Sequence, residues 1–291
     1  MASFSEDSHN PFSSCQTTYG SGDSYLILDI LPKDVADDHF YNLKHEIQWN
    51  EMYQKGGKVP REISIQGTID NNYEPLYRHP ADEQPSMVEW TPISKLIKDE
   101  IEKRIKQPLN HALIQYYKDG FDFIGEHSDK TLDVLRFSNI VNYSLGSART
   151  MILKSKTHDG RKGKFKLPHN SLFVLGWKTN REWFHSIRQD KRANNIKDDD
   201  ERAFDGQRIS LTLRTVATFR HNVTGKLYGQ GAKCKTLAEL EQQETVVEND
   251  DEKLLYAFSA ENKDPNFDWD KWYGNGFDTI NFKVLNSISK T

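Results

Sequence analysis

From Ala112 onward, the sequence consists of short apolar, β-branched segments that are separated by turns. Six segments have the length and composition of β-strands: Ala112–Tyr117, Ser138–Leu145, Thr150–Lys154, Leu172–Trp177, Phe184–Arg188 and Arg208–Phe219. Short strands at such regular spacing are typical of two packed sheets, as in a sandwich or a jelly roll. The central part of the chain is therefore predicted to form a β core.

Two helices are predicted ahead of these strands. The first covers Lys33–Gln48, follows a strand candidate at Ser24–Ile30, and has four apolar side chains near one face: Val35, Phe40, Leu43 and Ile47. The second begins with Thr91 as the N-cap and Pro92 in the first turn. Its expected buried stripe is Ile93, Leu96, Ile97, Ile101 and Ile105. The predicted fold class is α+β, with a mainly β core and N-terminal helices.

The 291 residues suffice for one sizeable core with tails. A mean hydropathy of −0.78 indicates that the ends are polar. Residues 1–22 are predicted to be a disordered leader and 23–221 the folded domain. The extension 222–291 contains an expected helix at Asp251–Glu261 and an aromatic run at Phe267–Tyr273. Docking on the core is expected for it, because exposed clustered aromatics are a liability; recruitment of a protein partner is the alternative.

The formal net charge of −4 excludes a global basic field, so nucleic-acid binding would have to rest on a local basic patch. The two cysteines, Cys15 and Cys234, predict no disulfide framework and favour a reducing compartment inside the cell, the nucleus or the cytoplasm. No stretch approaches the roughly 20 apolar residues of a membrane helix. The first residues lack the basic start and apolar run of a secretory signal.

A His-x-Asp triplet is the first candidate for chemistry. Residues two apart on an extended segment point to the same side, so His127 and Asp129 can present an imidazole and a carboxylate to one metal ion. The distant His185 would complete two histidines and one carboxylate, the ligand set of non-haem iron oxygenases. The chain contains ten histidines, so a chance match also fits the triplet. A packed core histidine likewise fits His185, which follows Trp183 and Phe184.

A second candidate is the strand Arg208–Arg214. Period two places Ile209, Leu211 and Leu213 on one face, and the residues on the other face are Arg208, Ser210, Thr212 and Arg214. Inside a barrel, these arginines need anionic partners, because an unpaired buried charge is costly. A dicarboxylic acid supplies them through bidentate, charge-assisted pairs. An exposed edge strand is the alternative interpretation of the same pattern.

Gln115 and Tyr117 precede a turn at Gly120 and an Ile124-x-x-His127-x-Asp129 ending. This order, together with the strand that begins at Arg208, resembles the AlkB family of iron(II)- and 2-oxoglutarate-dependent dioxygenases. The resemblance covers roughly residues 60–219. Gln115 stands where the family usually has Asn, and Ser replaces Asn in the arginine strand. The family's fold is a double-stranded β-helix, a jelly roll with helices packed outside.

The resemblance implies a set of ligands and a reaction. Iron(II) would be held by His127, Asp129 and His185, with O2 and 2-oxoglutarate as co-substrates. Arg208 would pair with the distal carboxylate of 2-oxoglutarate, and the rest of its pocket would be formed by Arg214, Thr212, Ser210, Tyr117 and Gln115. The expected activity is oxidative demethylation of N-alkylated bases in DNA or RNA, with release of formaldehyde, succinate and CO2.

The resemblance also suggests where an alkylated nucleic acid would bind. Arg61 lies in a segment that resembles the start of the family's nucleotide lid. Further contacts to the base and its phosphate are predicted for Tyr77, Arg78 and Lys130. A hairpin with a basic tip is expected to neutralise backbone phosphates through Lys154, Lys156, Arg161, Lys162 and Lys164.

Two other functions stay open at this point. The same chemistry could act on a protein side chain or a small metabolite, which the overall charge favours modestly. A non-catalytic interaction protein would require a broken site, yet all three candidate ligands and both arginines are present. The longer run between His185 and Arg208, which includes the charged segment Asp190–Gly206, is expected to be a surface loop. The protein is expected to be a monomer.

Overall fold

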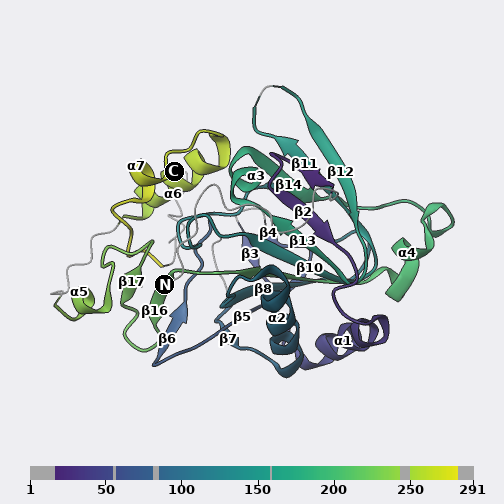
Figure 1. The fold of residues 1–291 in the computed structure, drawn as a ribbon, viewed down its shortest axis with the longest axis horizontal. Helices are drawn as coiled ribbons and strands as arrows, with labels where there is room; N and C mark the ends of the chain where they lie inside the picture. The colour runs from purple at the N-terminus through teal and green to yellow at the C-terminus, as the bar shows by residue number, and fades with distance from the viewer. Residues whose placement is uncertain (1–16, 55–56, 81–84, 158, 243–249, 281–291) are drawn as a thin grey trace, which may run out of the picture.

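The computed structural model describes residues 17–54, 57–80, 85–157, 159–242 and 250–280. Most strands belong to two sheets that face each other (Figure 1). The large sheet has the strand order β1 (Thr18–Tyr19), β2 (Ser24–Ile27), β13 (Ser171–Leu175), β10 (Ile140–Gly146), β15 (Arg208–Arg214), β8 (His111–Tyr117), β5 (Glu62–Gly67), β7 (Val88–Glu89). The small sheet has the order β12 (Lys162–Leu167), β11 (Arg149–Ser155), β14 (Trp183–Ile187), β9 (Ile124–His127).

The chain crosses repeatedly between the two sheets. It runs from β8 in the large sheet to β9 in the small sheet, returns to β10, continues through the β11–β12 hairpin of the small sheet, and then passes through β13, β14 and β15. All of the pairings among these strands are antiparallel. This alternation defines a jelly roll and confirms the predicted α+β fold class with a mainly β core.

The remaining elements surround this core. Two minor sheets contain β17 (Leu227–Gly229), β16 (Thr218–His221), β6 (Tyr73–Pro75), and β3 (Tyr53–Gln54), β4 (Gly57–Lys58). The α-helices are α1 (Lys33–Glu46), α2 (Pro92–Ile105), α3 (Trp177–Glu182), α4 (Asp199–Arg202), α5 (Leu237–Gln242), α6 (Asp251–Lys263) and α7 (Trp269–Tyr273). None of the helices in the described part of the chain has the length and hydropathy of a membrane-spanning segment.

The two N-terminal helices cover the outer face of the large sheet (Figure 1). Phe40 of α1 and Ile97 of α2 are buried against Val141 and Leu211, which point outward from the sheet. Removing this apolar surface from water stabilises the sheet on the side away from the site. The predicted stripe of α2 is wrong for Leu96, which is 57% exposed.

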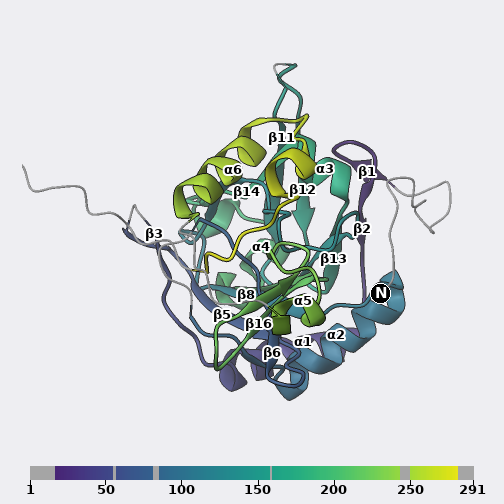
Figure 2. The same cartoon turned by 90° about the vertical axis from the view of Figure 1, so that its left-hand side faces the viewer.

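The inner faces of the two sheets form a second apolar cluster, to which both sheets contribute. Ile140 and Phe173 come from the large sheet, and Met151 and Ile187 from the small sheet. At one end of this layer, side chains from residues 250–280 pack on Leu132, which lies in the loop after β9. Figure 2 shows α6 and α7 beside the small sheet, on the side away from α1 and α2.

Some predicted boundaries are wrong. The expected strand Arg208–Phe219 is two strands, β15 and β16, and the expected strand Leu172–Trp177 ends at Leu175. The predicted disordered leader extends too far, because Thr18–Tyr19 pairs with β2; residues 1–16 lie outside the described part. The expected loop Asp190–Gly206 contains α4 and two short 3-10 helices, Asn194–Ile196 and Ala203–Gly206.

Candidate active site

His127 and His185 lie opposite each other on neighbouring strands of the small sheet. His127 is the last residue of β9 and His185 the middle residue of β14, and the two are direct partners in the antiparallel pairing. Directly opposite residues share one face of a sheet, and the imidazole centroids are 4.2 Å apart. His127 Nδ1 lies 2.8 Å from the Gly125 carbonyl oxygen, so Nε2 is the nitrogen left to bind a metal.

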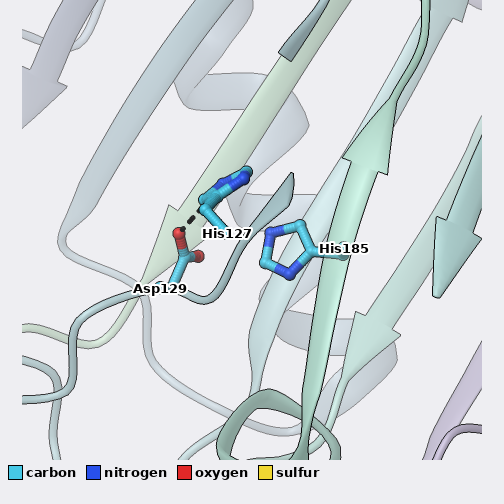
Figure 3. A group of neighbouring side chains, drawn as sticks. All are labelled: His127, Asp129 and His185. Carbon is cyan, nitrogen blue, oxygen red and sulfur yellow. Dashed lines mark ion pairs between the residues drawn. The ribbon is translucent and has the colours of Figure 1, made fainter. Parts of the chain in front are cut away.

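Asp129 follows β9 by two residues and completes the group (Figure 3). Its Oδ1 lies 3.9 Å from His127 Nε2, and one ligand atom from each of the three residues lies within 4.8 Å of the other two. Asn180 of α3 holds the backbone of Asp129, because its side chain accepts from the amide and donates to the carbonyl, both at 2.9 Å. Arg214 Nη2 donates to Asp129 Oδ2 at 3.0 Å. One carboxylate oxygen is thus fixed and the other faces the imidazoles.

The protonation states of the three residues suit a metal ion. Burial lowers the pKa of His185 to about 3 and also lowers the pKa of His127. Burial acts in the opposite direction on Asp129, but the adjacent Arg214 and the two histidines outweigh it, and the pKa of the carboxyl lies well below its usual range. At neutral pH the site therefore offers two neutral imidazoles and a carboxylate, the forms that bind metal.

Arg208 is completely buried (0% exposed) between the sheets. Its Nη2 donates to Asn142 Oδ1 at 3.1 Å, to Ser144 Oγ at 2.8 Å and to Ser210 Oγ at 3.3 Å. Its guanidinium lies over the Tyr117 ring, 5.2 Å from the centroid. Within the described part of the chain, Nε and Nη1 have no hydrogen-bond partner.

A buried guanidinium with two unused donors is costly unless an anion binds it. Burial lowers the pKa of Arg208 to about 10, so the group is still charged at neutral pH. Among the described residues, no carboxylate forms an ion pair with it. The arrangement fits a carboxylate ligand that accepts two charge-assisted hydrogen bonds, and it does not fit the alternative of an exposed edge strand.

A cavity between the sheets joins the metal site to the neighbours of Arg208. The triad lines it, together with the other predicted co-substrate residues: Gln115, Tyr117, Ser210, Thr212 and Arg214. The structure therefore places these residues around one cavity, and their roles in binding the co-substrate stay predictions. Arg214 was predicted to contact 2-oxoglutarate. In the structure its guanidinium forms an ion pair with the carboxylate of Asp129. Tyr117 donates its hydroxyl to Gln115 Oε1 at 3.2 Å, which orients both side chains.

Asn142 is a polar residue of this cavity that the sequence analysis missed. It lies on β10 opposite Thr212 of β15, and its Nδ2 donates to Ser210 Oγ at 2.7 Å and to Thr212 Oγ1 at 3.0 Å. Its Oδ1 accepts from Arg208. The available signal was the alternation within the predicted strand Ser138–Leu145, which places Asn142 on the face opposite Val141 and Tyr143.

A larger cavity of about 670 Å³ also includes His127 and Asp129 in its lining. Its other walls come from the segment 57–61, from His79 and Pro80, from β9 with the loop that follows, and from α6. Cavities of roughly 300–1,000 Å³ accommodate small organic ligands. Residues of the metal site therefore border two cavities, the small one between the sheets and the larger one.

The predicted substrate residue Tyr77 lines the larger cavity, but it is buried. Its hydroxyl accepts from the Lys130 amide at 3.1 Å, and Arg214 lies over its ring at 4.0 Å from the centroid. One face of the ring is thus occupied by Arg214. Tyr77 supports the arginine that holds the Asp129 carboxylate and borders the cavity.

The predicted substrate contact of Arg78 is wrong. Its guanidinium, 1% exposed, forms a double ion pair with Asp133 at 3.0 and 2.7 Å. Its remaining donors reach the backbone carbonyls of Phe277, Thr279 and Gly231. Because its three nitrogens are all used in buried contacts, Arg78 ties the C-terminal segment to the core and is not available to a ligand.

The other two predicted substrate residues border the larger cavity. Arg61 donates from Nη1 to the Phe123 carbonyl at 2.9 Å, and its Nε has no hydrogen-bond partner in the described structure. Lys130 donates from Nζ to Asn262 Oδ1 at 3.2 Å. Both cations are therefore placed to face a ligand, and their roles stay predictions.

The basic hairpin is β11–β12, as predicted, but several of its cations are engaged. Lys154 pairs with Glu126 at 2.8 Å and Arg161 with Asp159 at 2.7 Å. Lys156 donates to Ser128 Oγ at 2.9 Å and to the Glu261 carbonyl at 3.0 Å, and burial lowers its pKa to about 7. The prediction that Lys156 contacts phosphate is therefore wrong. The remaining two, Lys162 and Lys164, are exposed.

Comparisons with known proteins found one family and several relatives. Residues 23–214 match the 2OG-Fe(II) oxygenase superfamily. Human DNA oxidative demethylase ALKBH2 is 28% identical over 209 residues, which are 66% of this chain and 72% of that protein. Mouse alpha-ketoglutarate-dependent dioxygenase alkB homolog 3 is 23% identical over 198 residues, which are 65% and 60% of the two chains. The solved structure of OsALKBH1 covers 68% of this chain and all of that chain, at 20% identity and a TM-score of 0.47.

The matched segment contains the three metal-site residues and both arginines of β15. The chain therefore belongs to the 2OG-Fe(II) oxygenase superfamily. Within that class it is an AlkB-like, 2-oxoglutarate-dependent dioxygenase, as the resemblance implied. The donor set of two neutral imidazoles and a carboxylate fits iron(II), and the unused donors of Arg208 fit a dicarboxylic acid. Helix α6 lies outside the matched segment.

Replacing His185 with Ala removes one of the three ligands, and we expect stoichiometric binding of Mn(II), followed by electron paramagnetic resonance, to be lost. Turnover of 2-oxoglutarate should fall by more than the roughly 10- to 100-fold that loss of a supporting residue causes. His45→Ala, an exposed position on α1, is the matched control. A His185→Ala protein that binds one equivalent of Mn(II) as tightly as the wild type would contradict the assignment.

The lowered pKa values of His127 and His185 predict how metal binding depends on pH. Protons compete for an imidazole only below its pKa, so lowering the pKa moves this competition to more acidic solution. We expect the Mn(II) affinity of the apo-protein to change by less than about threefold between pH 8 and pH 6, whereas two imidazoles of ordinary pKa would lose more than about tenfold. Titrations at three pH values measure this, and a tenfold loss by pH 6 would show that the imidazoles are not shielded.

Proposed function

We propose that the protein removes N-linked alkyl groups from the bases of nucleic acid, with DNA as the first candidate, by oxidation with O2 and 2-oxoglutarate. The observation that carries this proposal is that two residues of the metal-ligand triad, His127 and Asp129, lie in the wall of a cavity of about 670 Å³, large enough for a base that has left its stack. Relatives named DNA oxidative demethylase support the choice of DNA.

The cavity has the charge that a nucleic acid requires, although the whole chain is acidic. Its lining includes the cations Lys58, Arg61, Lys130 and Lys263, compared with the acids Glu126 and Asp129; Lys58 pairs with Glu51, and Glu126 pairs with Lys154. Asp129 is already neutralised by Arg214 at 3.0 Å. A local excess of positive charge of this kind attracts phosphate and makes binding depend on salt.

In this proposal His127, Asp129 and His185 would hold iron(II), which together with 2-oxoglutarate and O2 supplies the oxidising power to hydroxylate an alkyl carbon. Arg208 binds the distal carboxylate of the co-substrate and so fixes its orientation. Arg214 keeps the Asp129 carboxylate turned toward the imidazoles. A base N-methyl group that has been hydroxylated loses formaldehyde, and succinate and CO2 are the other products.

The apolar side chains between the sheets have a separate role. Ile140, Phe173, Leu175 and Ile187 line the small cavity beside its polar groups. They exclude water from the co-substrate, so that the Arg208 guanidinium acts in a medium of low dielectric constant. The pocket therefore favours a diacid over neutral molecules of the same size, which can accept hydrogen bonds but leave the buried guanidinium charge without a counter-charge.

Replacing Arg208 with Ala should raise the KM for 2-oxoglutarate by roughly 10- to 100-fold, the loss of a hydrogen bond to a charged group. Arg208→Lys keeps the charge without the planar fork, and we expect an intermediate KM. Steady-state kinetics at varied 2-oxoglutarate measure this, with Arg202→Ala on α4 as the exposed control and thermal melting as the check on folding. A KM equal to that of the wild type would show that the diacid binds elsewhere.

The proposed substrate class is tested with a panel of single- and double-stranded DNA and RNA oligonucleotides that carry N-methylated bases. After incubation with iron(II), ascorbate and 2-oxoglutarate, we expect mass spectrometry to show demethylated product and an assay to detect formaldehyde. His127→Ala is the control. Turnover of 2-oxoglutarate without loss of methyl from any oligonucleotide would contradict the proposal and favour a protein or metabolite substrate.

A further inference from the structure

Helix α6 has two adjacent faces with different surroundings. Leu254, Ala257 and Phe258 are buried against the aromatic side chains of the C-terminal segment and Leu132 of the core. The neighbouring face, at the helical spacing i, i+4, i+7 and i+8, lines the larger cavity with Leu255, Ser259, Asn262 and Lys263. A helix that only covers the core needs the first face alone.

The C-terminal end of α6 is fixed to the loop that carries a metal ligand. The buried Glu261 carboxylate accepts from the Thr131 amide at 2.9 Å and from the Tyr273 hydroxyl at 2.8 Å. Lys156 Nζ donates to the Glu261 carbonyl at 3.0 Å. Because Thr131 follows Asp129 by two residues, the position of α6 is set relative to the metal site.

Asn262 is the residue of α6 whose side chain contacts both sequence neighbours of the metal-site residue Asp129. Its Oδ1 accepts from the Ser128 amide at 3.4 Å and from Lys130 Nζ at 3.2 Å, and these two residues flank Asp129. Its Nδ2 has no hydrogen-bond partner in the part of the chain that the structure describes, and Asn262 borders the cavity. An unused amide donor therefore belongs to a residue that borders the cavity.

We infer that α6 is a substrate-recognition wall of the enzyme, in which Asn262 donates from Nδ2 to a carbonyl oxygen or ring nitrogen of the alkylated base. Lys263, one residue further along the helix, neutralises a phosphate of the same strand. This inference rests on the proposed function. It assigns part of the selectivity to a helix that lies beyond the segment matched by the superfamily.

Asn262→Asp and Asn262→Ala test this together. Both remove the amide donor, but Asp keeps the acceptor that contacts Ser128 and Lys130. For both variants we expect the Kd and KM for a methylated oligonucleotide to rise by roughly three- to tenfold, the effect of one hydrogen bond. The kcat, the KM for 2-oxoglutarate and the affinity for Mn(II) should stay at wild-type values. Binding is measured by fluorescence anisotropy on protein loaded with Mn(II) and a non-oxidisable 2-oxoglutarate analogue.

Lys263→Ala should weaken binding and lower the slope of log affinity against log salt by about one. Two matched controls come from the same helix outside the cavity: Lys253→Ala removes the same charge from a side chain that is 75% exposed, and Tyr256→Ala alters a residue that is 71% exposed. Neither control should change oligonucleotide binding.

The outcomes separate this inference from the proposed function. Wild-type affinity for the oligonucleotide in both Asn262 variants would overturn the inference and leave the function intact. A parallel loss of Mn(II) affinity in both would also overturn it, because Asn262 would then act only by holding the metal loop. A wild-type protein that binds no methylated oligonucleotide, even at low salt, would overturn the function and the inference with it.

Discussion

The ion pair between Asp129 and Arg214 connects the two sheets at the point where the chemistry takes place. Asp129 lies two residues after β9 of the small sheet, and Arg214 ends β15 in the centre of the large sheet. Burying two charges is costly, but the 3.0 Å contact and the Tyr77 ring beneath the guanidinium compensate. Without Arg214, burial would raise the pKa of the carboxyl, and its free oxygen would no longer be held toward the imidazoles.

The walls of the two cavities come largely from different parts of the chain. Of the residues proposed to hold the metal and the diacid, His127, His185 and Arg208 lie on paired strands, where a ladder of hydrogen bonds fixes their positions, and Asp129 lies two residues after β9. The larger cavity is bordered by the segment 57–61 and by α6, which are not part of the jelly roll.

The sequence predicted the jelly roll and the inner face of β15 because both depend on local alternation. Period two alone places Arg208 and Arg214 on one side, and the burial of the strand directs that side inward. Strand β5 was missed although Glu62–Gln66 alternates between polar and apolar residues, the same signal that identifies β15; the alternation does not show that its polar side chains are buried as well. The Arg78–Asp133 pair and the contact of α6 with the metal loop join distant residues, so no local pattern signals them.

The proposed activity requires one ion and one diacid that occupy neighbouring positions between the sheets. A crystal structure of the protein with Mn(II) and 2-oxoglutarate, grown without oxygen, tests this most directly. We expect the ion to be bound by His127, Asp129 and His185, and the distal carboxylate to accept from Arg208. An ion held by other residues, or a diacid bound away from the Arg208 guanidinium, would contradict it.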